Sequence, residues 1–411
     1  MVDLKRVFMN ISIPTFKAFN NFNYCLIWVS TTLMICSHQM VALAQSYWIY
    51  DNTGSATILG VVGIAAAIPL LLIAPIGGAV ADRFNQKKLM IMCQTLQMSF
   101  AWAVVILLVM DLMVWQHLLV IGLGYGIIWA TNGPARQALL PKILDKSVLP
   151  NGIALITAGM SIAGLIAPAI AGVLYAKYSP EFVFFVSSML SVISLVIALF
   201  IRMPKSKAEV KGTKITSDAI DGLKYLWSDF PTRTVLIIGM VFFFMESPVH
   251  SLLSVLVVDV YKLESEGLGL LAAMLGVGGL VGNIFIATMP PKKRGLIFIF
   301  LAFLSGCALM GVSLIPVYMA GVIILTFQGF AGGGQYPMMQ ILMLKNMDPK
   351  YYGRIMSIIM MFFGFMPLAV LPAGIASDIL GIRTIIIILG VGLLVSSSLT
   401  LFTQKWLRDM D

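Results

Sequence analysis

Glu246, Pro248 and His250 form the stretch whose residue types and spacing could do chemistry. They lie inside a long apolar run, about 234–258, and the acid and the histidine share a helix face because they are four residues apart. Charge near mid-bilayer is costly, so such a residue faces a partner or a wet cavity. Burial also favours the neutral form of a carboxyl, which can then take up and release protons. Glu246 and His250 are therefore proton-coupling candidates, and Pro248 predicts a kink because it lacks an N–H donor.

His38 is a third candidate for proton coupling. It lies 13 residues before Asp51, and Glu246 lies 13 residues before Asp259. The two aspartates are 208 residues apart, close to half of 411, which indicates two repeated halves. We therefore expect His38 to face Glu246 across a cavity between the halves. The alternative is that the acid is structural, bonded to a neighbouring helix, and that both histidines are packed polar residues.

The elements that must position these residues are membrane helices. The chain is 59% hydrophobic and 11% charged, with a mean hydropathy of +0.96, whereas soluble domains are about 25% charged. A spanning helix needs about 20 apolar residues. Twelve runs of that kind are present, at about 24–46, 58–81, 89–110, 117–138, 148–174, 181–201, 234–258, 267–289, 295–314, 316–341, 351–377 and 383–404.

The runs divide into two groups of six. The polar stretch 202–232 separates them, so we expect an N-terminal bundle over 1–201, a cytoplasmic linker over 202–232 and a C-terminal bundle over 233–411. Pro168 and Pro372 open similar small-residue segments 204 residues apart, in support of a repeat. The expected fold class is an all-α membrane protein of twelve transmembrane helices in two pseudo-symmetric six-helix bundles.

Basic residues set the expected orientation. With a cytoplasmic N-terminus, all but three of the 27 lysines and arginines fall inside, the exceptions being Lys177, Lys262 and Arg383. Both termini are then cytoplasmic. Residues 1–22 are polar and mixed, so no cleavable signal is expected. This bias also accounts for the net charge of +9 without a nucleic-acid partner.

A compact charged segment joins the second and third runs. It reads Gly-Ala-Val-Ala-Asp-Arg-Phe-Asn-Gln-Lys-Lys over 78–88, and it resembles the loop between the second and third helices of the major facilitator superfamily. The resemblance implies a charge network that couples the loop to conformation, while the alternative is that its charges only fix topology. Asn85, where the family has glycine, is expected to tolerate a left-handed turn. The coupling residues are Gly78, Asp82, Arg83, Lys87 and Lys88.

The segments 132–141, 149–154 and 353–357 narrow the resemblance to the bacterial exporter branch that includes the enterobactin exporter. It implies a secondary active transporter in the inner membrane, exporting a small amphipathic molecule, siderophore- or drug-like, by proton-coupled alternating access. The alternatives are an importer or a lysophospholipid transporter of the same fold. A non-transporting scaffold or sensor is a further alternative. The expected partners are the small-molecule substrate, protons and the lipid bilayer, and the expected state is a monomer.

Several other residues complete the expected site. Arg136 could bind an anionic substrate or pair with Asp82 or Asp145. The candidate hydrogen-bonding residues for a substrate are Gln39, Gln45, Gln335 and Tyr336.

No cofactor or metal is expected. The glycines at 276–282 and 332–334 lack the Lys-Ser/Thr of a phosphate loop and indicate helix packing, so an ion gradient is the expected energy source. The four cysteines include no C-x-x-C pair, and the three histidines are scattered, so neither a metal site nor an enzyme is expected.

Overall fold

The structure, a computed structural model, describes residues 14–83, 85–145, 147–202, 224–263, 265–289, 292–346 and 352–410. The described residues form helices and no strand, and twelve of these helices are 20 to 32 residues long, which confirms the expected fold class. The linker 203–223 lies outside the described residues, so the domain boundaries stay a prediction. The long helices are α2 (Phe22–Thr53), α3 (Ala56–Arg83), α4 (Gln86–Val109), α5 (Trp115–Ile143), α6 (Leu149–Lys177), α7 (Pro180–Leu199), α9 (Phe230–Ser251), α11 (Ser265–Thr288), α12 (Arg294–Leu314), α13 (Tyr318–Asn346), α14 (Tyr352–Leu380) and α15 (Ile382–Thr403).

Local cap residues decide where the first helix ends. The apolar run stops near residue 46, but α2 continues to Thr53 because the aromatic and polar residues that follow are still compatible with a helix. Gly54 then takes a left-handed conformation with φ of 61°, and its N–H bonds the carbonyl of Tyr50. This is the usual C-terminal stop at a glycine.

The charged segment 78–88 is largely helical, which corrects the expectation of a loop there. Helix α3 runs to Arg83, and Asn85 has φ of −66° with its side chain accepting from the N–H of Lys88. Asn85 is therefore the N-cap of α4 and not a left-handed turn residue. The side chains of Gly78, Asp82 and Arg83 lie outside the described residues, so their coupling role stays a prediction.

The seventh span is interrupted after the predicted proline. Helix α9 passes through Pro248 and ends at Ser251, followed by the short helix α10 (Leu253–Val255) and the π-helical turn η2 (Leu256–Val260). The break falls at Leu252, four residues beyond the proline, so the run 234–258 is not one continuous helix. This broken segment directs its leucines between the two halves.

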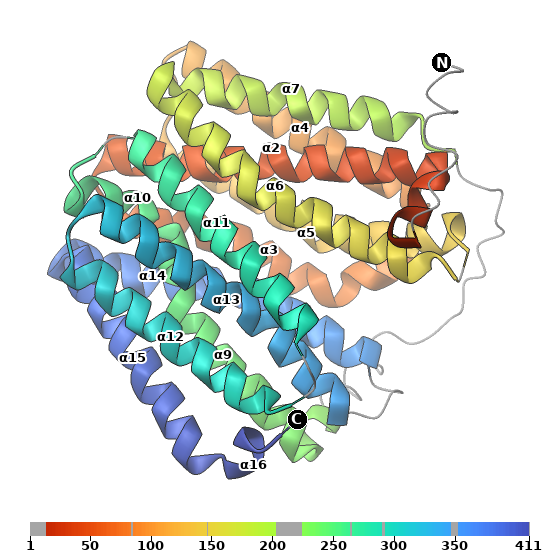
Figure 1. Cartoon of the computed structure of the whole chain (residues 1–411). Coiled ribbons are helices and arrows are strands. Elements are labelled where there is room, and N and C mark those ends of the chain that lie inside the picture. Colours follow the sequence, from red (N-terminus) through yellow and green to blue (C-terminus); the bar gives the residue numbers. More distant parts are fainter. Residues whose placement is uncertain are drawn as a thin grey trace.

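Two groups of helices make up the molecule (Figure 1). Helices α2 to α7 contact one another, and α9 and α11 to α15 do the same. The groups meet mainly where α3 contacts α14 and where α6 contacts α11. They diverge toward the end at which α2 begins and α15 ends (Figure 1).

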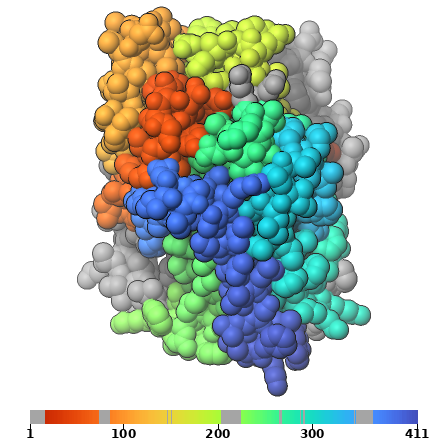
Figure 2. All heavy atoms as spheres, turned by 90° about the vertical axis from the view of Figure 1, so that its left-hand side faces the viewer, coloured from red at the N-terminus to blue at the C-terminus, as the bar shows by residue number. Residues whose placement is uncertain are grey.

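The other end, called here the closed end, is sealed by contacts between the halves. Figure 2 shows the atoms of α2 and α3 there pressed against those of the α10 region and α14. Asp378 at the end of α14 accepts from the hydroxyl of Ser55 at 2.7 Å and from the N–H groups of Ala56 at 2.7 Å and Thr57 at 2.9 Å. The hydroxyl of Tyr50 donates to Asp259 at 2.8 Å. An acid of one half thus caps a helix of the other.

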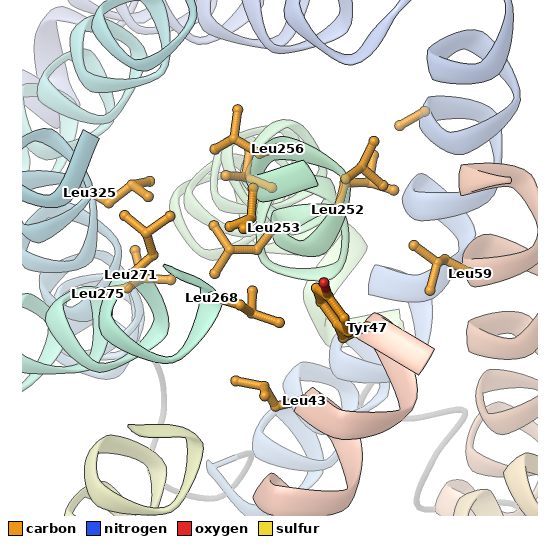
Figure 3. Close-up of a cluster of buried hydrophobic side chains, with 14 of the residues drawn as sticks. Leu43, Tyr47, Leu59, Leu252, Leu253, Leu256, Leu268, Leu271, Leu275 and Leu325 are labelled. Atoms are coloured by element: carbon orange, nitrogen blue, oxygen red, sulfur yellow. The ribbon is translucent and has the colours of Figure 1, made fainter. Parts of the chain in front are cut away.

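A leucine cluster lies inside the closed end. Figure 3 shows Leu252, Leu253 and Leu256 of the broken segment among side chains of both halves. All of these are buried and belong to one apolar core. The cluster fills the space between the halves near the closed end. Its other labelled members are Leu43, Tyr47, Leu59, Leu268, Leu271, Leu275 and Leu325.

Glycines bring the halves into backbone contact. A Cβ added at Gly269 of α11 would lie 2.8 Å from the Cα of Gly172 in α6. A Cβ at Gly60 of α3 would lie 2.5 Å from the Cα of Leu371 in α14. Both interfaces therefore need a residue without a side chain.

Candidate functional site

A cavity of about 700 Å³ lies between the two halves. Its described lining comes from α2, α3, α5 and α6 on one side and from α9, α11 and α13 on the other. It includes His38, Gln39, Gln45, Glu246 and His250, which sequence reasoning had singled out. The structure thus gathers these five residues around one space, whatever role each has.

Glu246 is the acid in the wall of this cavity. Its side chain is 3% exposed, and its Oε1 accepts a hydrogen bond from the amide Nε2 of Gln328 on α13. The hydroxyl of Ser305 on α12 donates to the Oε1 of the same glutamine at 2.8 Å. The other carboxyl oxygen, Oε2, is buried and has no hydrogen-bond partner. The carboxyl is therefore held on one side only.

Gly332 makes room for this carboxyl. A Cβ at Gly332 would overlap Oε1 of Glu246, so the acid lies directly against the backbone of α13. The glycine run 332–334 was interpreted as helix packing alone, and that interpretation is incomplete. Gly333 does pack against the backbone of Gly279, whereas Gly332 also shapes the niche of the acid.

The substitution Gly332→Ala is expected to displace the Glu246 carboxyl from Gln328. Loss of a hydrogen bond to a charged group corresponds to a change of about tenfold in an equilibrium constant. We therefore expect gradient-driven transport to fall about tenfold in reconstituted liposomes. The matched control is Gly133→Ala, because a Cβ at Gly133 meets nothing within 4 Å. Equal transport by the two variants would contradict this role of Gly332.

The two histidines of the cavity, His38 and His250, have different surroundings. The ring of His38 lies 5.1 Å from the rings of both Tyr125 and Trp129, centroid to centroid, and its buried Nδ1 has no hydrogen-bond partner. His250 is exposed to the cavity one turn beyond Glu246. His38 on α2 and Glu246 on α9 therefore border the same cavity from different groups of helices.

Three predicted site residues lie elsewhere. Gln335 is fully buried in α13 with both amide atoms unpartnered, and neither it nor Tyr336 is among the described residues that line the cavity. The ring of Tyr336 contacts that of Phe243 at 6.0 Å. Arg136 donates to the sulfur of Met160 at 3.7 Å. In the described side chains Arg136 has no ion pair with Asp145.

Lys87 and Lys88 act within the first half of the molecule. The ammonium of Lys87 donates to the carbonyl of Leu199 at 3.0 Å, at the end of α7, where a cation is favourable. The backbone N–H of Lys88 takes part in the cap at Asn85. These contacts neither require nor exclude the coupling role that the resemblance implies.

Sequence reasoning missed the residues that support Glu246 and the closed end. Gln328 and Ser305 are polar residues within apolar runs, and such interruptions are the signal that could have found them. Asp378 is likewise a charged residue that directly follows the eleventh apolar run. Among the described residues, no group of three or more His, Cys, Asp or Glu side chains could hold a metal ion.

Comparisons with known proteins agree with this geometry. The sequence model of a family described as "Transmembrane secretion effector" matches residues 13–411. The staphyloferrin A transporter of Staphylococcus aureus is 23% identical over 389 residues, 92% of this chain and 96% of the relative. Macrolide efflux protein A of Streptococcus pyogenes is 20% identical, covering 89% and 93%. Multidrug efflux pump Tap of Mycolicibacterium fortuitum is 22% identical, covering 90% and 92%.

Solved structures share the fold. The nucleoside transporter NupG superposes with a TM-score of 0.73 at 13% identity, covering 93% of this chain and 99% of that one. A bacterial homologue of the human lysosomal transporter Spinster, in an inward-facing and unoccupied conformation, gives 0.72 at 14% identity, covering 95% and 98%. The narrower resemblance to the branch of the enterobactin exporter stays a prediction.

Proposed function

Because the chain belongs to the transmembrane secretion effector family of the major facilitator superfamily, and so is a transporter and not an enzyme, we propose that it exports a small amphipathic molecule of the drug or siderophore kind. Export proceeds by alternating access and is coupled to protons. The observation that carries the proposal is a buried acid in the wall of a central cavity, between two halves that contact each other at one end.

The cavity supports alternating access because both halves line it. Besides the leucine cluster, Asp378 and Asp259 hold the closed end by hydrogen bonds from Ser55, from the first N–H groups of α3 and from Tyr50. Such contacts can break without unfolding either half, which would let the cavity open at this end while the other end closes. Alternating access then requires a second arrangement of the same two halves, in which the cavity is open at this end and closed at the other.

Export is favoured over import by the relatives. Two of the three proteins described above are efflux proteins, one of them for macrolides and one for several drugs. Import by the same fold is the runner-up, and the direction of substrate movement under a known gradient separates the two.

The diverging end is proposed to face the cytoplasm, because α2 begins and α15 ends there (Figure 1) and the distribution of basic residues in the sequence predicts that the first helix begins on the cytoplasmic side. In a variant whose four native cysteines are replaced, Ser206→Cys should react with an impermeant maleimide only from inside. Thr53→Cys, next to the closed end, should react only from outside. Labelling of both from the same side would overturn this topology.

The function itself is tested in proteoliposomes that hold the purified protein. The uncharged amphiphile triphenylphosphine oxide, in tritiated form, serves as the probe. A pH gradient should drive its movement against a concentration difference, and collapse of the gradient should stop that movement. Equal movement with and without a gradient would rule out proton coupling, and movement no faster than in protein-free liposomes would argue against transport of such molecules.

A further inference from the structure

The charged residues in the described wall of the central cavity are of one sign only. Among the described residues that line it, Glu246 is the only acid, and no lysine or arginine lines it. The remaining lining is apolar or neutral, contributed by residues such as Leu43, Leu59 and Gln39. A single carboxyl in an otherwise uncharged wall, surrounded by lipid, sets the electrostatic potential of the whole space.

The carboxyl is poised to balance a positive charge. Gln328 donates to Oε1, but Oε2 has no partner, and an ionised carboxyl with a bare buried oxygen is unfavourable without a nearby cation. The hydroxyl of Ser305 donates to the oxygen of the Gln328 amide, and this amide directs its N–H toward the acid. One carboxyl oxygen of Glu246 is therefore hydrogen-bonded and the other is bare.

Two aromatic rings border the cavity on the opposite wall. His38 and Tyr125 both line it, with their ring centroids 5.1 Å apart and their planes tilted by 53°. Aromatic faces attract a cation and pack against the apolar body of an amphiphile. Neither His38 nor His250 has a described hydrogen bond to an acid that would hold a second proton on the ring.

From this arrangement we propose that the preferred substrate class is a lipophilic monocation, such as a protonated amine or a quaternary onium ion, that uncharged amphiphiles are carried less well, and that polyanions are rejected. This inference rests on the proposed function, and within the drug or siderophore kind it favours molecules that carry positive charge. An anion in this cavity would meet the carboxylate and no compensating cation among the described lining residues, so both repulsion and desolvation oppose its entry.

The test uses two probes of equal shape and opposite charge. Tritiated tetraphenylphosphonium and tetraphenylborate are measured by equilibrium dialysis against the purified full chain in detergent, with empty micelles subtracted. We expect the wild type to bind the cation at least about tenfold more tightly than the anion. In Glu246→Gln the ratio should fall toward one, while Glu246→Asp, which keeps the charge, should retain a preference for the cation.

The matched control is Glu181→Gln, which removes the same charge at the start of α7, outside the cavity lining. It should leave the ratio unchanged. No preference in the wild type, a preference for tetraphenylborate, no measurable tetraphenylphosphonium binding, or an unchanged ratio in Glu246→Gln would each overturn the proposal. Because binding is measured without a membrane, failure here is distinct from failure of the transport assay, which uses an uncharged probe.

Discussion

Replacement of Glu246 by glutamine is expected to abolish transport driven by a pH gradient. Glutamine keeps the size of the side chain and can still accept from Gln328, but it cannot bind or release a proton. With triphenylphosphine oxide as probe, uptake driven by the gradient should fall to the level of protein-free liposomes. Exchange of the same probe without a gradient should survive, because this probe carries no charge for the acid to balance.

Glu181→Gln is again the control, since it lies outside the described cavity lining. Normal gradient-driven transport by Glu246→Gln would exclude this acid as the coupling site and leave His250, His38 or an uncoupled mechanism. Loss of tetraphenylphosphonium binding together with normal gradient-driven transport would assign Glu246 to the substrate and not to the proton. The two roles of the carboxyl are thus separable by experiment.

Removal of the Asp378 carboxyl is expected to open the closed end. Asp378→Ala deletes all three hydrogen bonds to the first turn of α3 at once. Loss of a helix cap costs up to about 2 kcal/mol, which would shift the two conformers by up to about 30-fold. With native cysteines replaced, Ser46→Cys in the cavity wall should then react faster with an impermeant maleimide applied from the closed end.

A nearby acid provides the comparison. Asp51 is exposed at the end of α2, on the same side of the molecule, and no described hydrogen bond joins its carboxyl to the other half. Asp51→Ala should therefore leave the labelling rate of Ser46→Cys near that of the parent. Asp378→Asn, which keeps one acceptor oxygen, should fall between the two. Equal rates for Asp378→Ala and Asp51→Ala would show that this cap does not hold the end closed.

The positions of the helices could be predicted from hydropathy because lipid imposes a simple rule on the chain. A spanning helix must satisfy its own backbone and expose apolar side chains, so its core is visible in the sequence. The helix ends were less visible. Helix α2 stops at Gly54 and α4 starts at the cap Asn85, and both signals are local chemistry that hydropathy does not contain.

The broken seventh span shows a different limit. Pro248 predicted a kink at the proline, whereas α9 runs through Pro248 and the break falls at Leu252, where leucines from both halves pack. A single sequence does not show which helices become neighbours. The kink stays a prediction, and the break at Leu252 was not predicted.

The same limit applies to the site. Glu246 and the two histidines were visible because ionisable residues are rare in apolar runs, and all three line the described cavity. Gln328 and Gln335 lie on one helix, seven residues apart, yet Gln328 borders the cavity and the described lining does not include Gln335. Two turns along α13 separate them, and only the tertiary structure tells which turn meets the cavity.

The glycine contacts between the halves have a mechanical consequence. Where Gly269 meets Gly172 and Gly60 meets Leu371, backbone lies against backbone. Helices that meet in this way can shift past each other by small sliding movements, as in shear motion. A methyl group at Gly269 or Gly60 would overlap the backbone of the partner helix. The close approach of the helices at these two contacts would therefore set how freely the two halves move relative to each other.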